Sequence, residues 1–282
     1  MMGKPVATAG FSFNRYSFML ITSKESRIYK QIQRLTRKKY RDREGLFLAE
    51  GRKNVREAVL CGAEARAFFL REEAELPEGL PEETPVYILK KELFDTISDT
   101  EESQGIGAVF RKPDCSPERL IREDRPGGNI VVLDRLQDPG NVGTILRTAV
   151  GAGYEAVVVI TGTCDIFSPK VVRAAAGNLF RIPVVLVGDG REMETLIRKL
   201  GKKLAVTSVS DDKETRHYAD AELTENVALV IGNEGNGVSP EILDHAEVRV
   251  RIPMLGGLES LNAAVAAGIL MYEAVRAGAG VN

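Results

Sequence analysis

Residues 130–150, Ile-Val-Val-Leu-Asp-Arg-Leu-Gln-Asp-Pro-Gly-Asn-Val-Gly-Thr-Ile-Leu-Arg-Thr-Ala-Val, pass from an aliphatic run through a polar loop into an amphipathic pattern. The aliphatic run is typical of a strand buried on both faces of a parallel sheet. At 100° per residue, Arg147 lies opposite the apolar side of the following helix, and Asn141 lies at the N-terminus of that helix. The apolar side comprises Val142, Ile145, Leu146, Ala149 and Val150. The stretch therefore predicts a strand, a loop and a helix.

Further along the chain, aliphatic runs at 157–160, 184–187, 204–207 and 227–231 alternate with helical patterns. The Ser-Pro pairs at 168–169 and 239–240 are typical of helix starts. This alternation predicts an open α/β fold with a parallel sheet. Ligands bind beyond the carboxyl ends of the strands in such sheets, so the loops there are the candidate site.

A smaller α/β module precedes this sheet. Strands are expected at 46–49, 67–70 and 86–89, alternating with helices, one of which (55–61) ends at Gly62. A segment rich in Pro, Gly and charge then predicts a linker. We divide the chain into a disordered tail (1–20), a first domain (21–112), a linker (113–128) and a second domain (129–282).

The composition is that of a globular protein: 282 residues, 44% hydrophobic, with 38 basic and 40 acidic side chains. Disordered, collagen-like and disulfide-scaffold classes are excluded. Cys61, Cys115 and Cys164 lie too far apart for a zinc cluster and suit a reducing compartment. No apolar stretch is long enough to span a membrane. We expect a cytoplasmic protein without a metal.

Positive charge is concentrated near the N-terminus. Residues 21–60 hold twelve Lys and Arg against five acids, and the densest part is 34–43. A nucleic-acid backbone is the natural counterpart, although a solvated helix face is the simpler alternative. The candidate phosphate-binding residues are Arg34, Arg37, Lys38, Lys39 and Arg41.

Two further segments carry polar groups at strand ends. Residues 232–237, Gly-Asn-Glu-Gly-Asn-Gly, place Glu234 in a glycine-rich loop that could also be a turn without function. Residues 252–262 run from Ile-Pro-Met to Ser260-Leu-Asn262 and open an apolar helix at 263–275. That helix should be buried in a core or a subunit interface, and Ser260 could simply be its N-cap. A Rossmann dinucleotide site is disfavoured because the first loop lacks GxGxxG.

Together, Asn141 with Arg147, the loop 232–237, and Ile252-Pro-Met followed by Ser260-Leu-Asn262 resemble the three motifs of SpoU-type (TrmH family) RNA ribose methyltransferases of the SPOUT superfamily. The resemblance covers about residues 129–276. It implies a deep trefoil knot in the parallel sheet, S-adenosylmethionine as methyl donor and a homodimer. The preceding module is similar to the L30e-like RNA substrate-binding domain of family members.

The resemblance also assigns residues. It implies cofactor binding by Thr207, Gly232, Ile252 and Leu261, and it matches Asn141, Arg147, Glu234, Ser260 and Asn262 to catalytic positions. The implied reaction is methylation of a ribose 2′-hydroxyl in RNA, with ribosomal RNA of the 23S type expected from the L30e-like module. A transfer RNA methyltransferase, a non-catalytic RNA-binding relative and a nucleotide-dependent α/β enzyme of other chemistry remain alternatives.

Overall fold

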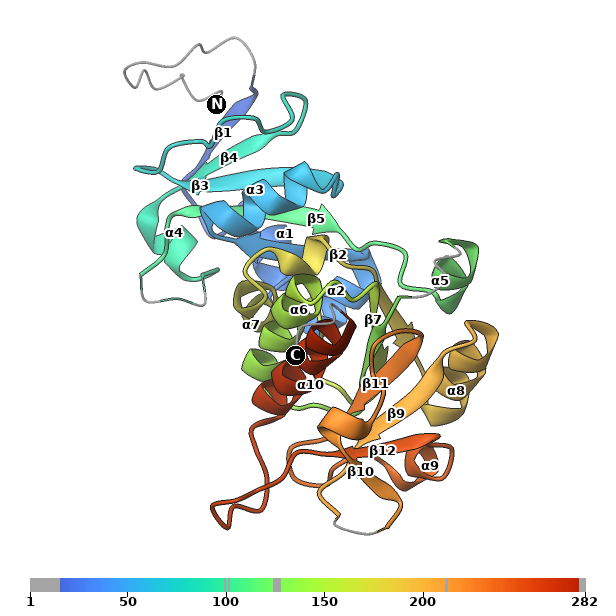
Figure 1. Ribbon diagram of the computed structural model, residues 1–282. Coiled ribbons are helices and arrows are strands. Elements are labelled where there is room, and N and C mark those ends of the chain that lie inside the picture. The colour runs from blue at the N-terminus through green and yellow to red at the C-terminus, as the bar shows by residue number, and fades with distance from the viewer. Residues whose placement is uncertain (1–15, 99, 101, 124–127, 211–212, 279–282) are drawn as a thin grey trace. The chain divides into compact units, whose positions relative to one another are not determined.

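The computed structural model describes residues 16–98, 100, 102–123, 128–210 and 213–278. The chain divides into two units (Figure 1). The first extends to Pro113 and also takes in residues 167–173; the second holds 114–166 and the residues from 174 onwards. The predicted division differs at 167–173, which we had placed in the second domain. Their phenylalanine, Phe167, packs on Phe47 with ring centroids 5.0 Å apart, a contact that local pattern does not reveal.

The first unit is built on a mixed five-stranded sheet. Its strand order is β1 (Phe18–Ile21), β4 (Val86–Leu89), β3 (Ala65–Arg71), β5 (Ile106–Arg111) and β2 (Leu46–Glu50). The pairs β1–β4 and β4–β3 are parallel, whereas β3–β5 and β5–β2 are antiparallel. The helices are α1 (Arg27–Arg34), α2 (Lys38–Glu44), α3 (Arg52–Leu60) and α4 (Lys91–Asp95). One core joins α1 and α4 to the sheet through Tyr29, Ile32, Leu35, Phe69, Leu93 and Phe94.

Two expectations for this unit are wrong. Residues 18–21 form β1, paired residue by residue with β4, although we expected a tail to residue 20; residues 1–15 lie outside the described residues. Phe18, Met19 and Leu20 are exposed, so no alternation of apolar and polar residues marks this strand. The helix expected between β3 and β4 is also absent from the described residues 72–85, which form turns and bends. The chain places α4 after β4 instead.

The second unit contains a seven-stranded sheet in which every described pairing is parallel. Its order is β10 (Thr215–His217), β12 (Val248–Arg251), β9 (Lys203–Thr207), β11 (Val227–Ile231), β6 (Ile130–Leu133), β7 (Ala156–Ile160) and β8 (Val184–Val187). The predicted parallel α/β sheet is therefore confirmed. All five predicted strands are present, and the structure adds β12 beside β9 and β10 at the edge of the sheet.

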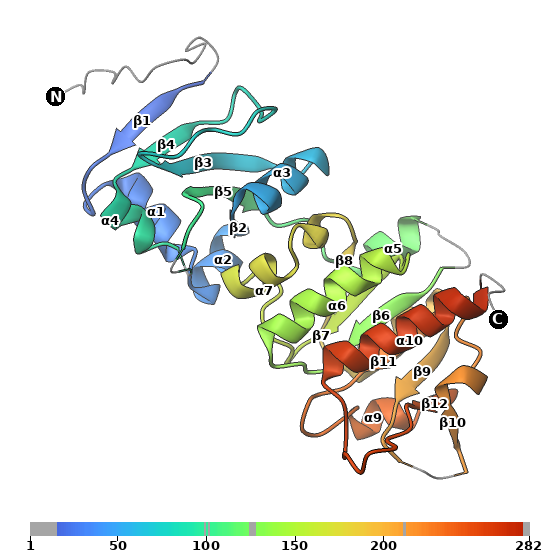
Figure 2. The ribbon, with the colours of Figure 1, turned by 60° about the vertical axis from the view of Figure 1, so that its left-hand side comes forward.

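Helices cover both faces of this sheet. The helices and short 3₁₀ turns of the second half of the chain are α5 (Pro117–Glu123), α6 (Pro139–Gly151), α7 (Pro169–Ala174), η1 (Asn178–Phe180), α8 (Gly190–Lys199), η2 (Tyr218–Asp220), α9 (Pro240–Leu243) and α10 (Ala263–Gly278). Leu120, Met193 and Ile242 bring α5, α8 and α9 into one core cluster with the strands. Figure 2 shows α6 and α10 side by side on the sheet, and they pack against each other. Within the described residues, no helix combines the length and the apolarity that crossing a membrane requires.

The predicted linker is partly structural. Pro117 begins α5, and Leu120 on that helix is 8% exposed and packs in the core of the second unit. The carbonyl of Cys115 accepts a hydrogen bond from the backbone N–H of Leu186 at 2.8 Å. A helix of two turns offers one buried residue, which is too few for a periodic pattern to show in the sequence. Residues 124–127 of the expected linker lie outside the described residues.

Candidate functional site

The loops that contain the three sequence motifs gather at one edge of the large sheet. Strands β12, β9, β11 and β6 are consecutive neighbours and run parallel, so their carboxyl ends meet at that edge. The loop before α6 follows β6, the glycine-rich loop follows β11, and the segment that leads to α10 follows β12. This is the edge at which α/β sheets bind ligands.

Asp138 caps α6 and sets the position of Asn141. The Oδ1 atom of Asp138 accepts a hydrogen bond from the Asn141 backbone N–H at 2.7 Å, and Pro139 occupies the first helical turn. These are favourable residues for the two positions. The predicted helix face is confirmed, because four of its five apolar residues are buried, Val150 is half-buried and Arg147 is exposed.

A chain of side-chain hydrogen bonds joins the three motifs. Asn262 donates from Nδ2 to Oδ1 of Asn141 at 2.9 Å, and Asn141 donates from Nδ2 to Oε1 of Glu234 at 3.0 Å. Glu234 also accepts the backbone N–H groups of Gln137 at 3.1 Å and Asp138 at 3.3 Å. The Asn141 amide is thereby held in one orientation by a donor on one side and an acceptor on the other. We call this set, Asn262, Asn141 and Glu234, the amide chain.

Glu234 is held in its ionised form. Partial desolvation raises the pKa of this carboxyl, but hydrogen bonds from Asn141 and from backbone N–H groups outweigh that effect and lower the pKa below its ordinary value. Glu234 is therefore a carboxylate at neutral pH and acts as an acceptor only. It cannot supply a proton to a reaction under these conditions.

The Glu234→Gln variant should lower the stability of the loops in neutral solution. Glutamine replaces one acceptor oxygen by an NH₂ group that faces the N–H donors of the amide chain. A lowered folded-state pKa contributes stability above the unfolded pKa, and that contribution is lost as pH falls through the folded value. The urea midpoint of the variant should therefore lie below that of the unaltered protein at pH 7, and the difference should shrink in acid. Glu225→Gln, which changes an exposed acid of the same unit, is the control. A difference that does not change between pH 7 and pH 3 would contradict the assignment.

The glycine-rich loop is closed by its own side chains. Asn233 accepts from the backbone N–H groups of Gly235 and Asn236 through Oδ1, both at 3.0 Å, and its Nδ2 donates to the Arg135 carbonyl at 2.8 Å. A Cβ at Gly232 would lie 2.3 Å from the backbone carbon of Gly237. The loop can close only because residue 232 is glycine.

Asp134 and Ser239 form a buried contact that sequence reasoning missed. Asp134 is 1% exposed, and its Oδ2 accepts the backbone N–H of Ser239 at 2.6 Å and its hydroxyl at 2.7 Å. The other oxygen of Asp134 accepts from Nε of Arg135 at 3.1 Å. The end of β6 is thereby tied to the start of α9. The only sequence signal was an acid directly after a buried strand.

Two other predicted catalytic residues stand outside the amide chain. Arg147 and Ser260 are exposed, and neither makes a hydrogen bond or ion pair with another residue in the part of the chain that the structure describes. The alternative reading of Ser260 as the N-cap of α10 is wrong. Asn262 takes that place, because its Oδ1 accepts the backbone N–H groups of Ala264 at 2.9 Å and Val265 at 3.2 Å.

The predicted cofactor residues lie at neighbouring strand ends. Thr207 is the last residue of β9, Gly232 follows β11 and Ile252 follows β12, while Leu261 precedes α10. Gly232 is buried and the other three are half-buried. Aliphatic side chains beside strand-end backbone groups suit an adenine ring, which needs an apolar wall and hydrogen-bond partners at its edge. The residues present therefore fit S-adenosylmethionine. No cluster of His, Cys, Asp or Glu that could hold a metal ion occurs among the described residues.

The basic stretch of the first unit is exposed with one exception. Arg34, Arg37, Lys38 and Lys39 lie on the surface. Arg41 is 3% exposed and donates from Nη1 to the Leu35 carbonyl at 2.8 Å, so its prediction as a phosphate-binding residue is wrong. Its guanidinium connects α2 to the end of α1, a structural role that its charge alone does not reveal.

Two family models match the chain. Residues 128–272 match the SpoU rRNA Methylase family, and residues 26–108 match the MRM3-like substrate binding domain. The chain is 34% identical to the 23S rRNA (guanosine(2553)-2'-O)-methyltransferase RlmP of Bacillus subtilis, over 90% of this chain and 98% of that protein. It is 30% identical to the 23S rRNA (uridine(2479)-2'-O)-methyltransferase of Streptomyces viridochromogenes, over 91% of both chains.

Solved structures show the same fold. The AdoMet-bound rRNA methyltransferase from Sinorhizobium meliloti superimposes with a TM-score of 0.81 at 30% identity, covering 92% of this chain and 98% of that one. The SpoU methyltransferase AviRb from Streptomyces viridochromogenes, in complex with AdoMet, has a TM-score of 0.80 at 29% identity, covering 90% and 98%. The chain belongs to the SpoU family of RNA 2′-O-ribose methyltransferases, which use S-adenosylmethionine as methyl donor.

Proposed function

We propose that this protein methylates a ribose 2′-hydroxyl in 23S-type ribosomal RNA. The observation that supports this most directly is the amide chain, which connects all three family motifs at the carboxyl edge of the sheet. The names of the relatives supply the RNA class. RlmP modifies a guanosine and the S. viridochromogenes enzyme modifies a uridine. The proposal therefore does not specify which base is attached to the modified ribose.

The residues divide the chemical work as follows. S-adenosylmethionine, when bound, supplies a methyl group on a sulfonium, which is a good leaving group. Thr207, Gly232, Ile252 and Leu261 hold the cofactor. Arg147 binds the phosphate next to the target ribose and stabilises the developing alkoxide, because a guanidinium keeps its charge and a planar fork of donors.

The remaining polar residues position this chemistry. Asn141, oriented by Glu234 and Asn262, presents the ribose to the methyl group, and Ser260 lies at the border of the same site. Alignment of the hydroxyl with the methyl group is the main requirement of the reaction, since the donor is already activated. The hydroxyl proton is released to solvent water as the methyl group is transferred, so none of these roles needs Arg147 to lose its own proton, which arginine does not do in proteins.

The exposed apolar side chains of the second unit support a homodimer. Val265, Tyr272 and Val275 on α10 are 52%, 52% and 40% exposed, and Leu255 and Leu258 in the preceding loop are 98% and 64% exposed. Apolar side chains gathered on one helix and the loop next to it are typical of an interface. We include in the proposal the trefoil knot, a cytoplasmic location and an active site completed by the second subunit. Light scattering should give the mass of two chains.

The function is tested by incubating the purified protein and S-adenosylmethionine with 23S rRNA, 16S rRNA, transfer RNA and a DNA copy of the 23S target. Mapping of 2′-O-methyl groups should show one new position in 23S rRNA alone, and DNA should not react because it lacks the 2′-hydroxyl. Methylation of transfer RNA in its place would establish the tRNA alternative. Failure to bind S-adenosylmethionine would identify a non-catalytic RNA-binding relative.

A further inference from the structure

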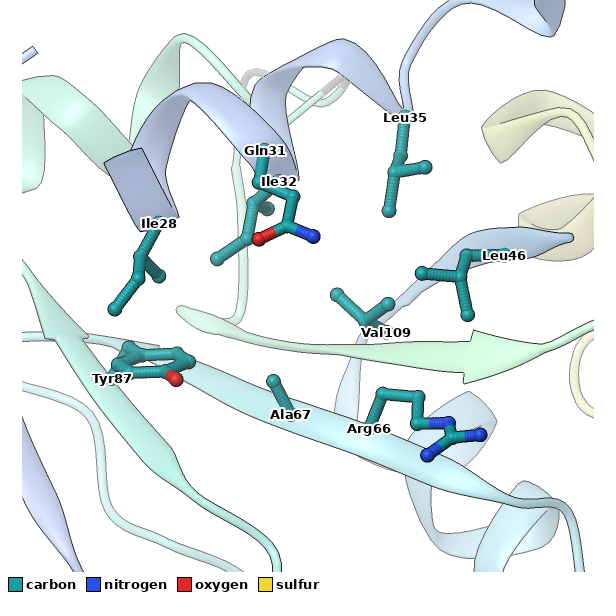
Figure 3. A pocket seen from close by; sticks show the side chains of 9 residues that line it. All are labelled: Ile28, Gln31, Ile32, Leu35, Leu46, Arg66, Ala67, Tyr87 and Val109. Atoms are coloured by element: carbon teal, nitrogen blue, oxygen red, sulfur yellow. The ribbon is translucent and has the colours of Figure 1, made fainter. Parts of the chain in front are cut away.

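A hollow lies in the first unit between α1 and the sheet. Its volume is about 110 Å³, and its walls are largely aliphatic, with Ile28 from α1, Leu35 directly after α1, Leu46 from β2 and Val109 from β5 (Figure 3). A dry apolar cavity of about 150 Å³ takes up a benzene molecule, so this hollow has room for most of one aromatic ring. Ala67 on β3 lines it with only a methyl group, which keeps the space open.

Two polar side chains also line the hollow and have groups left to bond. Figure 3 shows the amide of Gln31 and the hydroxyl of Tyr87 at the space between α1 and the strands. Neither group has a hydrogen-bond partner in the residues that the structure describes. A carboxamide offers both a donor and an acceptor, which matches the edge of a nucleobase, and a tyrosine ring provides an aromatic wall.

The rim of the hollow is basic. Arg27 and Arg34 lie four residues before and three residues after Gln31 on α1, so both are neighbours of Gln31 on the helix surface, and both are exposed. Arg66 lines the hollow and pairs with Glu64 at 2.6 Å, in an exposed contact of the kind that stabilises little. Phosphates on either side of a bound base would meet these guanidinium groups.

We propose that this hollow seats one unpaired base of the RNA substrate, with Gln31 binding the base edge and Arg27 and Arg34 the flanking phosphates. The proposal rests on the proposed action on RNA. Eight of the nine lining residues fall within 26–108, the segment that matches a substrate binding domain. An apolar seat with a basic rim favours a base with its phosphates over a neutral or basic peptide, because single-stranded RNA is bound by stacking together with backbone charge.

Two variants test the seat from opposite directions. Ala67→Leu fills the hollow without changing charge, and Gln31→Ala removes the amide from an exposed position where unfolding is not a concern. Gln33→Ala, on the same helix and exposed but not lining the hollow, is the matched control. Binding of the full chain is measured for an RNA hairpin with an unpaired loop and for a fully paired RNA duplex with the same number of phosphates.

The unaltered protein should prefer the hairpin, and both hollow variants should bind it about tenfold more weakly while their affinity for the duplex is unchanged. Arg27→Ala with Arg34→Ala should weaken binding of both RNAs and reduce its salt dependence. Equal hairpin binding by Gln31→Ala and the unaltered protein would overturn the proposal. A change from dimer to monomer in Ala67→Leu would also overturn it and identify a protein interface. Methyl transfer by the unaltered protein, measured in parallel, shows whether the proposed function itself holds.

Discussion

Replacement of Arg147 by alanine should lower the kcat of methyl transfer at least about 100-fold, the usual loss when a donor to a developing oxyanion is removed. Arg147→Lys should recover only a small part, because an ammonium keeps the charge but not the planar pair of donors. The thermal midpoint and the affinity for S-adenosylmethionine should not change, since Arg147 is exposed and no side chain in the described residues depends on it. The rate of methyl transfer is measured by single-turnover reaction with RNA, and the affinity for the cofactor is measured by calorimetric titration.

The control for Arg147 is Arg191→Ala. Arg191 is an exposed arginine of α8 in the same unit, and α8 belongs to the core cluster on the other face of the sheet from α6. The Arg191→Ala variant loses the same charge as Arg147→Ala, and it should transfer methyl groups at the rate of the unaltered protein. If Arg147→Lys kept near-full turnover, neither phosphate binding by a planar fork nor proton removal by arginine could explain the site.

Replacement of Gly232 by alanine should abolish tight cofactor binding. The new Cβ would lie 2.3 Å from the Gly237 carbon and from the Val238 nitrogen, and these are backbone atoms that cannot move aside as a side chain can. Overpacking of this kind costs about 1–3 kcal/mol, so the thermal midpoint should also fall by several degrees. We expect S-adenosylmethionine to bind at least about tenfold more weakly, because the proposed cofactor site lies at this loop and a loss of about 1.4 kcal/mol in binding free energy is a factor of ten.

Gly235→Ala is the matched control within the same loop. Its Cβ would meet only the Asn233 Oδ1 atom at 3.7 Å, an ordinary contact, and its backbone N–H would still bond to that oxygen. This variant should bind the cofactor normally. Normal binding by Gly232→Ala would show that the loop does not approach the cofactor, and the placement of the cofactor at β11 would be wrong.

The strands at the centre of the large sheet could be predicted because they are buried on both faces. Burial on both faces produces continuous aliphatic runs, and β6 and β11 have the predicted bounds. The two strands beyond β9, which are β12 and the edge strand β10, were missed because neither has such a run. β12 alternates Val and Arg and buries only one side, while β10 has three residues and no pattern to recognise.

Part of the candidate site could be predicted from the sequence, and part of it depends on the tertiary structure. Asn141 and Glu234 could be identified from motif chemistry, but their hydrogen bond spans 93 residues and forms because β11 pairs with β6. The capping role of Asn262 depends on where α10 begins, three residues after Ser260, and helix boundaries are the least certain feature of a sequence pattern. Arg41 has the charge of its neighbours, and only packing shows that it is buried.

By itself, the sequence determined the parallel α/β class, the motif residues and the concentration of positive charge near the N-terminus, since each depends on residues close together in the chain. Tertiary structure alone decided which loops meet. Asp134 contacts Ser239 across 105 residues, and residues 167–173 join the first unit. The physical reason is that the order of strands in a sheet follows from the packing of whole elements, and periodicity records only which side of each element is buried.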